Sequence, residues 1–125
     1  MEDKPLILVV DDNADTRMLV SMILNKTGFS CATAENGVAA LARLKEGLPP
    51  DLIISDIMMP EMDGYATMRE IRQQREFAKL PIIALTAKAM RGDRNKCVEA
   101  GANDYLPKPI DSEKLLSLLR VWLYR

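Results

Sequence analysis

The sequence predicts an α/β fold, a five-stranded parallel sheet with helices on both faces, built as a single (βα)5 domain over residues 1–125. Short apolar runs alternate five times with longer segments whose apolar residues recur at helical spacing, and the connections between them are short. Such alternation is typical of parallel sheets, because a crossover between parallel strands usually contains a helix. The length suits one domain with one core, and no linker, repeat or low-complexity tract divides the chain.

The strands are predicted from apolar runs that turn residues bracket. Residues 52–54 are too few for a buried helix and lie between Pro50 and Pro60, so they indicate a strand buried on both faces. Asp56 follows where this strand emerges into a loop. The five predicted strands are residues 5–10, 29–34, 52–54, 81–85 and 104–106.

The helices are predicted from apolar stripes and from residues that start or stop helices. In the third helix, Met68 and Ile71 should point inward and Arg72 outward. Ser112 is expected to cap the last helix, because a serine hydroxyl can accept a hydrogen bond from a free backbone N–H. The five predicted helices are residues 13–27, 38–47, 65–75, 90–100 and 112–122.

Composition and charge exclude several classes of function. A formal net charge of −1 provides no basic field for nucleic acid or an anionic membrane, and the absence of histidine excludes histidine catalysis and histidine metal sites. Residues 1–4 do not resemble a signal peptide, and no apolar run has the length of a membrane span. Cys31 and Cys97 lack CxxC spacing and are expected to be reduced. These features predict a cytoplasmic protein.

Polar side chains stand at four predicted strand ends, at Asp11-Asp12, Asp56, Thr86 and Lys108. The carboxyl ends of parallel strands share one edge, where ligands bind in α/β sheets. Three carboxylates there repel one another unless a cation joins them, and oxygen ligands favour Mg²⁺. Lys108 offers a charge to a phosphate, Thr86 offers a hydroxyl, and Asp56 can act as a nucleophile that forms an acyl phosphate. Each residue also has an ordinary explanation as a cap, turn or solvated charge, but their convergence favours a site.

These residues resemble the response-regulator receiver domains of two-component signalling, and the resemblance covers essentially the whole chain. The chain is similar to chemotaxis regulators, and its residues 84–94 resemble receivers attached to hybrid histidine kinases. The resemblance implies a flavodoxin-like fold with strand order 2-1-3-4-5. The matching segments are Asp11-Asp12, Ser55-Asp56-Ile57-Met58-Met59-Pro60, Asp63-Gly64, Leu85-Thr86-Ala87 and Lys108-Pro109.

The resemblance also implies the roles of the site residues. Asp56 would accept a phosphoryl group from a sensor histidine kinase or a phosphotransfer protein, so the chain would not be an enzyme acting on another substrate. Mg²⁺ or Mn²⁺ would be held by Asp12, Asp56 and the Met58 carbonyl, with Asp11 acting partly through water. The residues that would contact the phosphoryl group are Lys108, Thr86 and Ala87.

The same resemblance implies how the phosphorylated state would be signalled and how long it would last. Thr86 and Tyr105 would act as the switch that changes a protein-binding face on the last two helices and the strand between them. Met58 and Lys88 match positions that tune self-dephosphorylation, and neither can serve as a general base toward water. The phosphoryl group should therefore be lost slowly. Candidate partner contacts are Arg91, Arg94 and Lys96.

The Lys108–Pro109 peptide bond is expected to be cis, because Lys108 must turn inward at its strand end and X-Pro bonds adopt cis at low cost.

Three alternatives belong to other classes. A haloacid-dehalogenase-like phosphatase needs a second aspartate two positions after the nucleophile, where this chain has Met58. A flavodoxin needs a phosphate loop after the first strand, and the glycine-rich loops of nucleotide-binding folds are absent. A pseudo-receiver that acts only as an interaction module usually lacks a site residue, and none is missing here.

Overall fold

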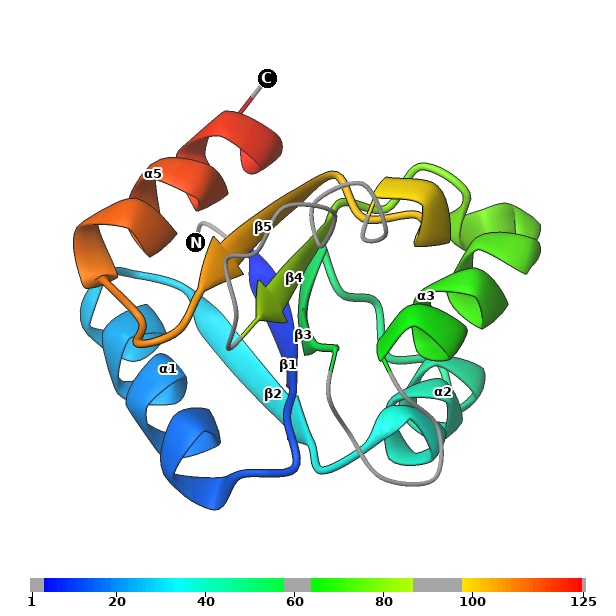
Figure 1. Ribbon diagram of the computed structural model, residues 1–125, viewed down its shortest axis with the longest axis horizontal. Coiled ribbons are helices and arrows are strands. Elements are labelled where there is room, and N and C mark those ends of the chain that lie inside the picture. The colour runs from blue at the N-terminus through cyan, green and yellow to red at the C-terminus, as the bar shows by residue number, and fades with distance from the viewer. Residues whose placement is uncertain (1–3, 58–63, 87–97, 125) are drawn as a thin grey trace.

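The computed structural model describes residues 4–57, 64–86 and 98–124, and it has a five-stranded parallel sheet with helices on both sides (Figure 1). The strands are β1 (Leu6–Val10), β2 (Ser30–Ala34), β3 (Leu52–Asp56), β4 (Ile82–Thr86) and β5 (Asp104–Pro107). The helices are α1 (Ala14–Lys26), α2 (Gly37–Lys45), α3 (Gly64–Gln73), the short 3-10 helix η1 (Arg75–Phe77) and α5 (Ser112–Leu123). The strand order is β2-β1-β3-β4-β5 and all pairs are parallel, which confirms the predicted flavodoxin-like order.

The sheet separates two hydrophobic cores. Helices α1 and α5 cover one face, and α2 and α3 cover the other (Figure 1). Alternate residues of a strand point to opposite faces, so Leu8 and Val10 of β1 join the α2/α3 core while Ile7 and Val9 join the α1/α5 core. All residues of β3 and β4 are buried, which explains why these runs are almost continuously apolar in the sequence.

The register brings the strand ends to one edge. Asp56 at the end of β3 is paired with Leu85, so Thr86 lies one residue beyond that pair on β4. Thr86 is paired with Pro107 of β5, and the backbone N–H of Lys108 donates to the Thr86 carbonyl at 2.7 Å. The first strand is extended by a hydrogen bond from Asp11 N to Ala34 O at 3.1 Å.

Two local expectations are wrong. The N-cap of α5 is Asp111, whose side-chain Oδ1 accepts from Glu113 N at 2.9 Å, and Ser112 is the first helical residue. Aspartate caps as well as serine, and its carboxylate also interacts favourably with the positive end of the helix dipole. The helix predicted over residues 65–75 is α3, which ends earlier, at Gln73, and is followed by η1.

Arg72 does not point into solvent as expected. Its half-buried guanidinium donates to the Gly101 carbonyl at 2.9 and 2.7 Å, to Asn103 Oδ1 at 2.7 Å and to the carbonyls of Phe77, Ala78 and Leu80. These acceptors lie before β4 and β5, beyond the reach of helical periodicity. A guanidinium offers five donors, so it can satisfy several such carbonyls together.

Three further expectations can be compared with the structure. The Lys108–Pro109 peptide bond is cis, as predicted. Of the helix predicted over residues 90–100, the structure describes residues 98–100, which are helical. No helix in the described ranges combines the length and the apolar character needed to cross a bilayer.

Candidate functional site

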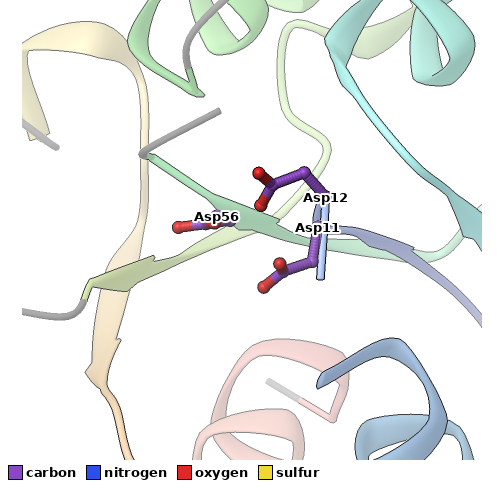
Figure 2. Close-up of side chains that lie close together, drawn as sticks. All are labelled: Asp11, Asp12 and Asp56. Carbon is purple, nitrogen blue, oxygen red and sulfur yellow. The ribbon is translucent and has the colours of Figure 1, made fainter. Parts of the chain in front are cut away.

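Three carboxylates gather at the carboxyl edge of the sheet. Asp11 and Asp12 follow β1, and Asp56 ends β3; one oxygen from each lies within 4.8 Å of the others. The side chains extend to the same side of the strand ends (Figure 2). Asp11 is fully buried and Asp56 is 3% exposed, whereas Asp12 is open to solvent. The chain therefore forms the acidic cluster that the positions of its strand ends predict.

Lys108 provides the positive charge in this cluster. Its Nζ lies 3.0 Å from Asp11 Oδ2 and 3.5 Å from Asp56 Oδ2. Partial burial alone would lower the pKa of Lys108, but the neighbouring Asp11 and Asp56 carboxylates outweigh this effect and raise the pKa above its ordinary value. The ammonium is therefore charged at neutral pH. Within the described residues, the cluster has three carboxylates, and the Lys108 ammonium pairs with two of them.

Asp11 is held through both its backbone and its side chain. Its backbone N–H donates to Ala34, its Oδ1 accepts from Asn13 N at 2.9 Å, and its carbonyl accepts from Arg17 Nη1 at 2.7 Å. Its buried Oδ2 faces Lys108 as an ion pair but accepts no well-aligned hydrogen bond from the described part of the chain. Asn13 and Arg17 were not predicted, although the position of Arg17 in the first turn of α1 could have indicated it, because helical side chains lean toward the N-terminus.

Asp12 contrasts with Asp11. Its carboxylate is exposed and makes no hydrogen bond or ion pair within residues 4–57, 64–86 and 98–124. It can therefore turn toward a ligand at little cost. The protein holds Asp11 in place and leaves Asp12 with free acceptor oxygens at the mouth of the site.

The backbone of Asp56 is closely packed. The Ser55 hydroxyl donates to the Asp56 carbonyl at 3.2 Å. Gly64 begins α3 directly against this part of β3, and its N–H donates to the Ile57 carbonyl at 3.1 Å. A side-chain carbon on Gly64 would collide with the Asp56 and Ile57 backbone. In the sequence, Gly64 was identified only as part of the matching Asp63-Gly64 segment, and this contact was not predicted.

The predicted switch residues lie on neighbouring strands. Thr86 is buried at the end of β4. Tyr105 is half-buried on β5, paired with Ala84, and lines a hollow of about 560 Å³ together with residues of α5. The remaining predicted residues lie outside the described ranges: Met58, Ala87, Lys88, Arg91, Arg94, Lys96 and Cys97.

Comparison with known protein families identifies the class. The sequence model of the response regulator receiver domain matches residues 7–120, which include all the described site residues. The chain belongs to this family. It is therefore a receiver domain of two-component signalling, and this assignment replaces the phosphatase and flavodoxin alternatives.

Solved receivers share both the fold and part of the sequence. A response regulator from Chloroflexus aurantiacus superposes with a TM-score of 0.93 at 32% identity, covering 98% of this chain and 100% of that chain. The receiver domain of sensor histidine kinase PA1611 from Pseudomonas aeruginosa has a TM-score of 0.89 at 37% identity, with 98% and 100% covered. That structure is described as having a magnesium ion coordinated in the active site cleft.

Curated relatives differ in length. An uncharacterized 14.6 kDa protein of Leptolyngbya boryana is 43% identical over 114 residues, which is 91% of this chain and 86% of that protein. The sensor histidine kinase CheAY of Helicobacter pylori is 36% identical over 92% of this receiver, but the match is only 14% of the kinase. The receiver thus matches both a protein of similar length and a small part of a much longer one.

Proposed function

We propose that this receiver accepts a phosphoryl group on Asp56 from a phosphohistidine, in a Mg²⁺-dependent reaction, and passes the resulting state to a protein partner. The observation that carries the proposal is the placement of Asp56, 3% exposed, beside two further carboxylates and Lys108. A structural aspartate would not require this surrounding charge.

The chemistry follows from these positions. A carboxylate oxygen of Asp56 attacks phosphorus; the new O–P bond forms as the N–P bond breaks, and the electron pair of that bond stays on the imidazole nitrogen. The ammonium of Lys108, 3.5 Å from Asp56 Oδ2, is within reach of oxygens on the transferred group. The Thr86 hydroxyl and Ala87 are proposed to complete the phosphoryl environment. The partner is a histidine kinase or a phosphotransfer protein.

The donor atoms fit Mg²⁺ or Mn²⁺. Three carboxylates supply oxygen ligands within 4.8 Å of one another, and the buried Asp11 Oδ2 lacks an aligned hydrogen-bond donor in the described residues. Asp12, Asp56 and the Met58 carbonyl would hold the ion, with Asp11 acting partly through water. When bound, the ion supplies positive charge that offsets the carboxylates and the phosphoryl oxygens. The magnesium in the PA1611 receiver supports this assignment.

Intact-mass spectrometry tests the proposal. The chain is incubated with acetyl phosphate, or with a phosphorylated histidine kinase domain, in the presence of Mg²⁺. We expect a gain of one phosphoryl group that disappears when EDTA removes the metal. No gain from either donor would leave the chain as an interaction module and would overturn the proposal.

Asp12→Asn should weaken Mg²⁺ binding by about tenfold or more, because it removes one anionic ligand at the mouth of the site. The same change should raise the free energy of unfolding of the metal-free protein, since it relieves repulsion with Asp11 and Asp56. Isothermal titration calorimetry measures the first effect and urea denaturation the second. An unchanged affinity would mean that the metal site is wrongly placed.

Thr86 and Tyr105 are proposed to transmit the phosphorylated state to the surface of β5, α5 and the helix predicted over residues 90–100. The phosphoryl oxygens would attract the Thr86 hydroxyl, and the movement of this side chain would leave space that the Tyr105 ring can occupy. Phosphorylation would thus shift the population between two orientations of the ring. Met58 and Lys88 are proposed to slow the loss of the group by providing no general base.

Thr86→Ala should keep phosphorylation but reduce the accompanying chemical-shift change at Tyr105 by more than about half, because the methyl side chain offers no hydroxyl donor. Two-dimensional NMR before and after phosphorylation measures the change. Thr86→Ser retains the hydroxyl and should respond like the wild type. Identical shifts at Tyr105 in the wild type and Thr86→Ala would contradict the coupling.

A further inference from the structure

Arg17 occupies an unusual place in the first turn of α1. The helix begins at Ala14, so Arg17 is its fourth residue, and its backbone N–H donates to Asn13 O at 3.1 Å. A cation near a helix N-terminus is unfavourable, because the helix dipole is positive there. The side chain is nevertheless half-buried and turned back to the loop, where Nη1 donates to the Asp11 carbonyl at 2.7 Å. This is the one hydrogen bond that the guanidinium makes within the described part of the chain.

The contact falls on the peptide that joins the two acidic residues. Residues 11–13 connect β1 to α1, and the other anchors of this loop act on either side of that peptide. Asp11 N is tied to Ala34 of β2, and Asn13 N is tied to the Asp11 carboxylate. Within the described residues, only Arg17 holds the Asp11 carbonyl, which is the oxygen of the Asp11–Asp12 peptide. The orientation of this peptide decides where the Asp12 side chain starts.

We propose that Arg17 is a positioning residue for the metal site: its guanidinium fixes the Asp11–Asp12 peptide and thereby aims the otherwise free Asp12 carboxylate at the cation. The inference rests on the proposed Mg²⁺ site and concerns affinity for the ion. Groups that orient ligands from outside the ligand shell commonly change metal affinity by 10–100-fold when they are removed. Arg17 acts through a backbone carbonyl, so the lower end of that range is expected.

The direction of the change in Mg²⁺ affinity distinguishes a positioning role of Arg17 from a purely electrostatic one. A guanidinium close to the acidic cluster repels a cation, so on electrostatic grounds alone a neutral residue at position 17 should tighten Mg²⁺ binding. Positioning predicts the opposite result, weaker binding in a variant that carries more net negative charge. Arg43 provides the matched control. It is exposed, lines the same hollow of about 280 Å³ as Arg17, and makes no hydrogen bond to the site in the described residues.

The experiment titrates Mg²⁺ into the metal-free chain by isothermal titration calorimetry at fixed ionic strength. Arg17→Met should bind about tenfold more weakly than the wild type, and Arg43→Met should bind as tightly or slightly more tightly. Backbone ¹⁵N relaxation should show a lower order parameter for the Asp12 amide in Arg17→Met and no change in Arg43→Met. Arg17→Gln, whose amide nitrogen lies two atoms closer to the backbone than Arg17 Nη1, replaces Arg17→Met if the methionine variant does not fold.

Each outcome decides a different point. Binding by Arg17→Met that equals or exceeds that of the wild type overturns the inference and leaves the metal site intact. An equal loss in Arg43→Met also overturns it, because the loss would then not depend on the Asp11 contact. If the wild-type chain binds no Mg²⁺, both the proposed metal site and this inference are overturned.

Discussion

Asp56→Asn is expected to abolish phosphorylation of the chain. The amide is neutral and its nitrogen lone pair is delocalised, so the side chain cannot attack phosphorus as the carboxylate does. The substitution keeps the size of a residue that is 3% exposed and should leave the fold intact. Intact mass after incubation with acetyl phosphate and Mg²⁺ measures the result: one added phosphoryl group for the wild type and none for Asp56→Asn.

Asp51→Asn is the matched control for this substitution. Asp51 precedes the same strand, at the opposite edge of the sheet, where its Oδ2 accepts from Leu6 N at 2.7 Å. An asparagine there can still accept this hydrogen bond, so Asp51→Asn should be phosphorylated like the wild type. A phosphoryl gain that survives in Asp56→Asn would show that another residue is the acceptor.

Gly64→Ala is expected to lower the free energy of unfolding by about 3 kcal/mol, the upper part of the usual range for overpacking. The added Cβ would lie 2.9 Å from the Asp56 carbonyl carbon and closer still to the Asp56 oxygen and the Ile57 Cα. These are backbone atoms at the end of a buried strand, so they cannot move aside as a flexible side chain could. Urea denaturation followed by circular dichroism measures the loss.

Gly64→Ala should also impair phosphorylation, because the backbone with which the added carbon collides includes that of Asp56. We therefore expect folded Gly64→Ala to be phosphorylated more slowly than the wild type in the intact-mass assay. Gly28→Ala is the comparison: Gly28 has a φ of +93° with nothing within 4 Å of the added carbon, so it should cost only about 1 kcal/mol and leave phosphorylation unchanged. Equal stability losses in the two variants would mean that helix α3 adjusts to the extra carbon.

Most of the fold and the composition of the acidic site could be predicted from the sequence. Hydrophobic periodicity is a local property, and buried parallel strands such as β3 and β4 have a nearly continuous apolar pattern. Once the strands are parallel, their carboxyl ends share an edge. The sequence therefore predicts a cluster of Asp11, Asp12, Asp56 and Lys108, and the structure brings these residues together.

Contacts between elements could not be predicted in the same way. Helical periodicity indicated that Arg72 faces outward, but the guanidinium reaches carbonyls more than one element away. Asp111 and Ser112 are neighbouring residues that cap equally well, so the sequence could not distinguish which of them begins α5. In both cases more than one hydrogen-bond partner is available. Which partner is used depends on how segments are placed in space, and the local sequence pattern does not give that placement.

The residue pattern was enough to predict the α/β class, the edge of the sheet where the acidic residues meet and the identity of those residues. The contacts that hold the site became visible only in the folded chain: Arg17 on the Asp11 carbonyl, Asn13 on its carboxylate, and Gly64 against the backbone of Asp56. The reason is one of range. Hydrophobic periodicity and turn residues act over a few residues. A hydrogen bond or a backbone contact instead requires two distant segments to be placed relative to each other to within a few tenths of an ångström.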